Sequence, residues 1–409
     1  MRSYVQSLQS AIDGTALDPQ KVHTTHEGRP IWVRYDLDAI GRAIQPTVFA
    51  SRPPDLWRYR ELLPLPIDAA PVTLGEGLSP LLAAPRLGKA LGVPELLIKD
   101  ESQLPTGSFK SRGLCMAISM ANHFGIRRVA IPTAGNAGGA MAAYAARAGM
   151  EAFVFMPRDT PVVNQMECVL AGAKVFLVNG LINDCGAIVR AGAERMGWFD
   201  CSTLKEPYRL EGKKTMGLEL AEQLDWRLPD VIVYPTGGGT GLIGMWKAFA
   251  ELRQLGWLRS EKLPRMVCVQ SDGCAPMVRA LERGERFAAP WENAKTCASG
   301  LRVPGAVGDF MILDAIRESG GTAVAVPESR IAEAMLRANS LEGIAICPES
   351  AACVLAVERL VGEGFIKPSD RVVLFNTGAA QKYVECVPLN LPLIENPKDV
   401  NYDHMAAHP

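Results

Sequence analysis

Short apolar runs alternate with longer segments of helical periodicity through most of the chain. The apolar runs predict strands at residues 96–99, 128–131, 152–156, 174–178, 231–234, 266–270, 322–326 and 372–376. The segments between them predict helices, among them 108–124, 136–148, 183–197, 241–255 and one that begins after Thr160 and ends at Gly172. Strands that alternate with helices are typical of parallel sheets covered on both faces. The pattern therefore predicts an α/β fold, in which ligands bind at the carboxyl ends of strands.

The composition is that of a globular protein large enough for two domains. The chain has 409 residues, of which 48% are hydrophobic and 21% are charged. Its 43 basic and 44 acidic residues give a net charge of -1, so no overall field attracts nucleic acid or an anionic membrane. We therefore expect a small-molecule ligand and neither a nucleic-acid nor a membrane partner.

The cysteines and the first residues of the chain indicate the compartment. Ten cysteines are scattered with no Cys-x-x-Cys pair, which favours reduced thiols over a structural zinc site. His23 and His26 have no cysteine or third histidine nearby, so we expect no metal. The N-terminus lacks the apolar run of a signal peptide, and no stretch is long enough to span a bilayer. These features predict a cytoplasmic protein.

Lys110 stands among small residues, in the run PTGSFKSRG that covers residues 105–113. Most lysines are solvated surface groups, and Lys110 alone would be no exception. A lysine that attacks an aldehyde must be neutral, and a partly apolar pocket lowers the pKa of the amine by desolvation. Phe109 suits such a pocket, and two further segments favour this second interpretation.

The first of these segments is Gly237-Gly238-Gly239-Thr240-Gly241, between a predicted strand and a predicted helix. Consecutive glycines let backbone N–H groups converge at a helix N-terminus, which suits a phosphate. The run lacks the lysine of a P-loop and the spacing of a dinucleotide fingerprint. A flexible turn is the simple alternative, but four glycines in five positions favour a phosphate site.

Two polar residues follow predicted strands, and each keeps two interpretations. Asn136 lies in the second segment, Thr133-Ala134-Gly135-Asn136, and either caps the helix that follows or donates its amide to a phenolate oxygen of a cofactor ring. Thr377 follows the strand at 372–376, and its hydroxyl either contacts a pyridine nitrogen or caps a turn.

The segment from Tyr208 to Thr215 carries three cations in what we expect to be a short loop. A solvated run of charge is the usual interpretation of such a segment. Alternatively, Arg209 and one of the lysines would bind an anionic group of a substrate.

The motifs SFK, TAGNAGGA and GGGTG occur in the order and spacing of the fold-type II pyridoxal-phosphate enzymes, which the chain resembles. The resemblance is strongest to the threonine synthases, and it includes TLGEG (73–77), PYRLEGKKT (207–215), LEGIAICPESAA (341–352) and VVLFNTG (372–378). It extends over nearly the whole chain, from about residue 34 to about residue 383. It implies two domains, each with a mostly parallel sheet flanked by helices, and a homodimer.

Four regions are expected from this resemblance and the sequence pattern. Residues 1–70 would form an irregular N-terminal extension that packs on the large domain. Residues 71–115 and 236–385 would form the large cofactor-binding domain, and residues 116–235 a small mobile domain. Residues 386–409 would form a C-terminal tail.

The resemblance implies pyridoxal 5'-phosphate as the cofactor, held by a Schiff base to Lys110, the catalytic residue. Phe109 would pack near the cofactor ring, and Asn136 would contact its O3' atom. Thr377 would face the pyridine nitrogen, and residues 237–241 would surround the phosphate. The substrate would be bound by four side chains, with Arg209 on its phosphate: Ser108, Thr133, Arg209 and Lys214.

The implied activity is that of a threonine synthase, a carbon–oxygen lyase of amino-acid biosynthesis that converts O-phospho-L-homoserine and water to L-threonine and phosphate. Ser111, Lys205-Glu206 and Glu349-Ser350 differ from the residues usual in these enzymes. One alternative is therefore a β-elimination or β-replacement enzyme for serine, threonine or O-phosphoserine. A non-catalytic cofactor-binding protein is another, but retention of Lys110, Asn136 and Thr377 together argues against it.

Overall fold

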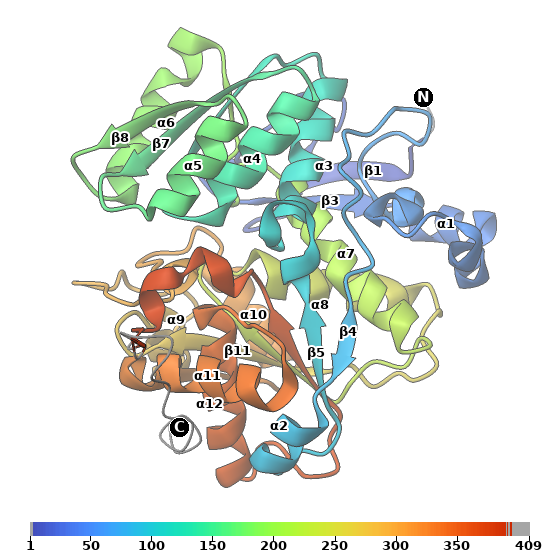
Figure 1. The fold of residues 1–409 in the computed structure, drawn as a ribbon. Helices are drawn as coiled ribbons and strands as arrows, with labels where there is room; N and C mark the ends of the chain where they lie inside the picture. The colour runs from blue at the N-terminus through green and yellow to red at the C-terminus, as the bar shows by residue number, and fades with distance from the viewer. Residues whose placement is uncertain (1–2, 390, 392, 395–409) are drawn as a thin grey trace.

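The structure, a computed structural model, describes residues 3–389, 391 and 393–394. The described chain forms a six-stranded sheet, a four-stranded sheet and a small three-stranded sheet near the N-terminus. Figure 1 shows the four-stranded unit, in green, above the six-stranded unit, whose colours run from cyan through yellow to red. Two helices, α3 (Lys110–His123) and α7 (Tyr208–Gln223), lie between these two units (Figure 1).

The six-stranded sheet is parallel except at one edge. Its order is β12 (Thr322–Val326), β11 (Arg265–Ser271), β10 (Val231–Pro235), β13 (Val372–Asn376), β5 (Leu96–Asp100) and β4 (Leu81–Ala83). Only β4 is antiparallel to its neighbour. Every residue of β10 and of β13 is buried, because helices cover both faces of a parallel sheet.

Alternate residues of the central strands enter two different cores. Val231 and Val233 of β10 pack with the helices of one face, whereas Ile232 and Tyr234 pack with those of the other. The first face carries α2 (Pro85–Leu91), α11 (Ile331–Glu342) and α12 (Pro348–Gly362). The second face carries α8 (Thr240–Gln254), α9 (Pro276–Glu282) and α10 (Asp309–Glu318).

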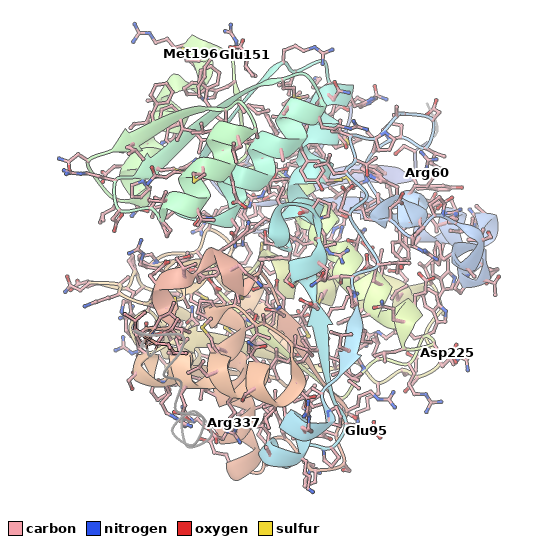
Figure 2. All side chains as sticks on the ribbon, in the orientation of Figure 1. Arg60, Glu95, Glu151, Met196, Asp225 and Arg337 are labelled. Atoms are coloured by element: carbon pink, nitrogen blue, oxygen red, sulfur yellow. The ribbon has the colours of Figure 1, made fainter. Side chains whose placement is uncertain are left out.

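The four-stranded sheet is parallel throughout. Its order is β8 (Lys174–Val178), β7 (Glu151–Pro157), β6 (Arg128–Pro132) and β9 (Phe199–Asp200). Helices α4 (Asn136–Arg147) and α5 (Val162–Leu170) cover one face, and α6 (Ile182–Met196) covers the other. Figure 2 places Glu151 and Met196 at the outer end of this unit, whereas Glu95, Asp225 and Arg337 surround the six-stranded one.

Helices α3 and α7 cross at close range over a buried ion cluster. A Cβ atom on Gly212 would lie 2.0 Å from the Arg112 carbonyl oxygen, so the crossing requires glycine there. Arg112 pairs with Glu101 (2.6 Å) and Glu219 (2.5 Å), and Lys99 pairs with Glu219 at 3.0 Å. All four side chains are fully buried, so the cluster joins β5, α3 and α7 away from water.

The N-terminal segment is more regular than the sequence pattern predicted. It forms an antiparallel sheet of β1 (Val5–Ser10), β2 (Ala16–Leu17) and β3 (Ile31–Tyr35), followed by α1 (Leu37–Ala43). Along β3 the burial alternates, and the Tyr35 hydroxyl donates to Glu211 at 2.8 Å. The prediction of an irregular extension was wrong because proline and charge dominate this segment, while its strands are short.

The strands predicted after residue 95 are confirmed to within one or two residues at each end. The prediction of a loop at Tyr208–Thr215 was wrong, since these residues form the start of α7 and are buried. The division into domains stays a prediction, as does the tail, most of which lies outside the described residues. None of the helices that the structure describes is long and apolar enough to cross a bilayer.

Candidate active site

A cavity of about 680 Å³ lies where the carboxyl ends of β6, β10 and β13 face one another. Its predicted residues come from five segments that are far apart in the sequence. The predicted residues that line it are Phe109, Lys110, Thr133, Asn136, Arg209, Gly237, Gly238, Gly239, Thr240, Gly241 and Thr377. Ser108 and Lys214 are the two predicted residues that do not line it.

Lys110 is the first residue of α3 and opens onto the cavity. Its Nζ lies 3.9 Å from the centre of the Phe109 ring. Burial and, to a smaller extent, the positive charge of Arg209 lower the pKa of Lys110 from 10.5 to about 7, and the charge of Glu349 opposes this shift. The amine is therefore able to be neutral near neutral pH, as a nucleophile for an aldehyde requires.

The loop before Lys110 has a strained backbone that the C-terminal segment holds in place. Thr106 and Gly107 both have positive φ angles, of 62° and 59°. The carbonyl of Gly107 accepts a hydrogen bond from the Ala379 amide at 2.9 Å, and that of Thr106 accepts one from Lys382 Nζ at 2.5 Å. These contacts fix the position from which Lys110 enters the cavity.

Asn136 presents its amide N–H₂ group to the cavity. Its side chain makes no capping bond to α4, so the capping interpretation is excluded. The Oδ1 atom accepts hydrogen bonds from Asn164 Nδ2 (3.2 Å) and Lys382 Nζ (3.3 Å). These two donors fix the orientation of the amide, since only an oxygen accepts from both. The Nδ2 atom then donates to the Tyr383 hydroxyl at 3.0 Å.

Residues 237–241 form a tight turn into α8, which begins at Thr240. Gly239 has a φ of 75°, and a Cβ atom there would lie 2.2 Å from Ile312 Cδ1. A Cβ atom on Gly241 would lie 2.0 Å from the Tyr234 hydroxyl oxygen. The first N–H groups of α8 have no partner within the helix, and together with the helix dipole they suit a phosphate. The donor set therefore fits a phosphorylated cofactor.

Thr377 follows β13, and a backbone hydrogen bond joins it to Phe109, the residue before Lys110. Its carbonyl accepts from the Phe109 amide at 3.1 Å, and its own amide donates to Ser350 Oγ at 3.0 Å. The Thr377 hydroxyl lies 3.6 Å from Cys347 Sγ at the wall of the cavity. A neutral hydroxyl thus lies at the wall of the cavity, and its contact with a pyridine nitrogen stays a prediction.

Arg209 lies in the first turn of α7 and is 2% exposed. Its Nη1 donates to the Cys201 carbonyl at 2.6 Å, whereas its buried Nε has no hydrogen-bond partner. Glu206, whose charge acts on the Arg209 guanidinium, accepts bonds from the Tyr208 and Arg209 amides, and burial raises the pKa of Glu206 to about 7. An unpartnered, charged N–H group at the wall of a cavity favours an anionic ligand.

Two predicted substrate contacts lie outside the cavity. Lys214 is fully buried and pairs with Glu211 (2.8 Å) and Glu251 (2.9 Å). Its charge is therefore neutralised inside the protein. Ser108 is also fully buried, and its hydroxyl has no hydrogen-bond partner.

The sequence reasoning missed several residues of the cavity wall. Tyr383 and Glu349 line it, as do residues 299–307, whose irregular sequence gives no pattern from which to predict a site. Glu349 had a usable indication, because Glu349-Ser350 differ from the residues usual in the threonine synthases. Elsewhere, Asp13, His26 and Glu27 form a small group on the N-terminal sheet, but two of the three are exposed and such groups are common without a metal.

The family model of the pyridoxal-phosphate dependent enzymes matches residues 72–378. The chain belongs to this family. Threonine synthases of Methanosarcina acetivorans and Methanocaldococcus jannaschii are 36% and 33% identical to it, over 86% and 88% of this chain and 85% and 89% of theirs. A third, from Mycobacterium bovis, is 32% identical over 82% of this chain and 90% of its own length.

Solved structures show the same fold at lower identity. Maize serine racemase superimposes with a TM-score of 0.63 at 20% identity, over 74% of this chain and 88% of its own. Diaminopropionate ammonia lyase from Escherichia coli gives 0.65 at 19% identity, over 77% and 88%. The chain is thus a pyridoxal-phosphate-dependent enzyme with the fold-type II architecture that its sequence predicted.

Proposed function

We propose that this enzyme is a threonine synthase, which converts O-phospho-L-homoserine and water to L-threonine and phosphate. The relatives with this name cover most of the chain. The observation that carries the proposal is a single cavity that holds Lys110, the N-terminus of α8 and the unpartnered N–H of Arg209. One anion site suits the cofactor phosphate, and the second suits a phosphate on the substrate. A dehydratase of serine or threonine would have no use for the second.

Residues already on the cavity wall suit the cofactor's groups. The amides at residues 237–241 would hold its phosphate, Asn136 Nδ2 would contact O3', and Phe109 would pack near the ring. When bound, the cofactor supplies an aldehyde for the Lys110 amine and a ring that accepts electrons. Thr377 would face the ring nitrogen with a neutral hydroxyl, which would stabilise a protonated ring less than a carboxylate, so the ring would accept electrons less strongly.

Lys110 would be the proton carrier of the reaction. Released by the substrate amine, its neutral Nζ would remove the proton from Cα and, once it has released that proton, one from Cβ. The γ-phosphate leaves Cγ with its bonding electron pair, and Cγ takes up a proton to become the methyl carbon of threonine. In the water addition, the hydroxyl goes to Cβ, the remaining proton of the water goes to the phosphate, and Cα recovers its proton. Each transfer needs a lysine whose pKa lies near neutrality, which burial provides here.

The cellular setting and the assembly belong to the same proposal. We expect a homodimer in the cytoplasm, with residues 116–235 moving against the larger domain when the substrate binds. The resemblance to the threonine synthases supports the dimer, and ten free cysteines are compatible with a reducing compartment.

A spectral titration tests the proposal. The cofactor-loaded protein is titrated with serine, threonine, O-phosphoserine, homoserine and O-phosphohomoserine, and the visible absorption of the cofactor is followed. We expect O-phosphohomoserine to change the spectrum at the lowest concentration. A response to serine or threonine with none to O-phosphohomoserine would instead support a dehydratase.

A further inference from the structure

Glu349 is a buried carboxylate that the proposed reaction does not use. It is the second residue of α12, lines the cavity and is 4% exposed. Its Oε1 accepts a hydrogen bond from the Gly300 amide at 2.7 Å. Its Oε2 is buried and has no hydrogen-bond partner. A buried carboxylate with one bonded oxygen is costly, and the neighbouring Tyr383 hydroxyl offsets this cost only in part, so a positive charge in the cavity is favourable beside it.

The groups that face Glu349 come from three parts of the chain. Cys347 directly precedes α12 and Cys353 lies within it. Tyr383 belongs to the C-terminal segment. The third group is Lys110, from α3. Only Lys110 among these four is a base that becomes positively charged.

The charges around Lys110 are opposed. Arg209 disfavours a proton on its amine, whereas Glu349 favours one. Lys213 of α7, whose Nζ lies 4.0 Å from the centre of the same Phe109 ring, is a further cation that repels the protonated form. Of the described carboxylates, Glu349 is the one whose charge acts on Lys110 in this way. A lysine that carries a proton between carbon atoms must hold it for part of the cycle. Because burial disfavours a charged amine, a nearby carboxylate is needed to stabilise that protonated form.

We propose that Glu349 is a positioning residue of the active site, whose carboxylate holds the proton-bearing form of the Lys110 nitrogen in the cavity. The inference rests on the proposed function, because it takes Lys110 to be the residue that carries the cofactor. Tyr383 completes the arrangement, since its hydroxyl accepts from Asn136 Nδ2 and lies beside the carboxylate. Through Tyr383, Glu349 thus links the protonation of Lys110 to Asn136, the residue predicted to contact O3'.

A merely structural role for Glu349 is the alternative. Its bond to the Gly300 amide anchors the loop that forms one wall of the cavity. Glu349→Gln separates the two roles, because the amide oxygen of glutamine still accepts from Gly300 but carries no charge. Glu349→Asp makes the opposite change, since it keeps the charge and shortens the side chain.

The test is a pH titration of the visible absorption in the cofactor-loaded protein, without substrate. The band reports the proton on the nitrogen that links Lys110 to the cofactor. We expect Glu349→Gln to lower the midpoint by about one pH unit or more, and Glu349→Asp to restore a midpoint close to that of the wild type. Glu328→Gln is the matched control, since Glu328 pairs with Ser271 outside the cavity and should leave the midpoint unchanged.

A Glu349→Gln midpoint equal to that of the wild type would overturn the inference and leave the proposed function intact. A loaded wild type without a visible band, or a band that survives Lys110→Ala, would overturn the proposed function instead. If Glu349→Gln does not fold, Tyr383→Phe decides, because loss of the hydroxyl beside Glu349 weakens its charge. A downward shift in Tyr383→Phe then supports the inference, and an unchanged midpoint contradicts it.

Discussion

Lys110 is an ordinary lysine whose surroundings make it reactive. Burial lowers the pKa of its amine to about 7, so the neutral form is lost below that pH and dominates above it. We expect the rate at which the cofactor-free protein takes up pyridoxal phosphate to rise through about pH 7. Stopped-flow measurement of the visible band checks this, and a rise only near pH 10, as for a solvated lysine, would contradict it.

Arg209 is the residue to which we assign the phosphate of the substrate. Arg209→Ala removes a charge-assisted hydrogen bond, worth about 1.5–3 kcal/mol, so KM for O-phosphohomoserine should rise roughly 10-fold to 100-fold. Cofactor retention should not change. Steady-state phosphate release measures KM, and the exposed Arg253 on α8 provides the control, Arg253→Ala. If Arg209→Ala weakens the binding of cofactor and substrate equally, Arg209 has a structural role and does not bind the substrate phosphate.

Glu206 shows the cost of a buried carboxylate near the same site. Its pKa is raised by burial from 4.5 to about 7, so the folded protein favours the protonated form and loses stability as the pH rises from 4.5 to about 7. Glu206→Gln should therefore raise the free energy of unfolding in alkaline buffer, by on the order of 3 kcal/mol, and by much less in acid. Urea unfolding at both pH values checks this, and equal effects would contradict it.

At the scale of the element, the turn into α8 is the most constrained part of the site. Gly241→Ala places a Cβ atom 2.0 Å from the Tyr234 hydroxyl, which must shift the amides that would hold the cofactor phosphate. We expect cofactor affinity to fall at least about tenfold, since one lost charge-assisted bond has this magnitude. Gly362→Ala in α12 meets no atom within 4 Å and serves as the control. Equal cofactor affinity in both variants would show that the amides of residues 237–241 do not bind the cofactor phosphate.

The elements themselves were largely predictable, with two instructive exceptions. Strands such as β8 and β12 are continuous apolar runs between helices, so their positions follow from the sequence. Helix α7 was predicted as a loop because its charges suggested solvent. Of its cations, Lys214 pairs with Glu211 one turn away and with Glu251, which is distant in sequence. No local pattern carries such a pairing, and the same holds for the short strands near the N-terminus.

At the scale of the whole molecule, the buried ion cluster under α3 and α7 joins the site to the core. Glu219 pairs with both Arg112 and Lys99, and these charges lower its pKa to about 2. Its contribution to stability is therefore present above pH 4.5, the ordinary value, and is lost as the pH falls toward 2.

Removal of this charge should be severe. Glu219→Gln leaves two buried cations with less compensation, and we expect the free energy of unfolding at pH 7 to fall by about 3–5 kcal/mol. Glu363→Gln, which breaks an exposed pair with Arg359, should change it little. Chemical denaturation of both variants measures the difference, and similar losses would show that the cluster does not stabilise the fold.

The sequence predicted where the site lies in the fold, but it predicted only some of the contacts among the side chains there. Parallel strands of one sheet deliver the residues that follow them to one edge, so the convergence of Thr377 and residues 237–241 follows from the sequence. Asn136 follows β6 of the other sheet and reaches the same cavity because the two sheets face each other there. The contacts that orient these residues could not be predicted from the sequence. The orientation of Asn136 depends on Lys382, almost 250 positions away in the chain, and the wall that contains Glu349 depends on its bond to Gly300.

The most direct test of the account is turnover of O-phosphohomoserine by the cofactor-loaded wild type, with both products measured. The account predicts L-threonine and phosphate in equal amounts, no ammonia, and loss of both products in Lys110→Ala. Release of ammonia from serine or threonine, with no threonine formed from O-phosphohomoserine, would contradict it.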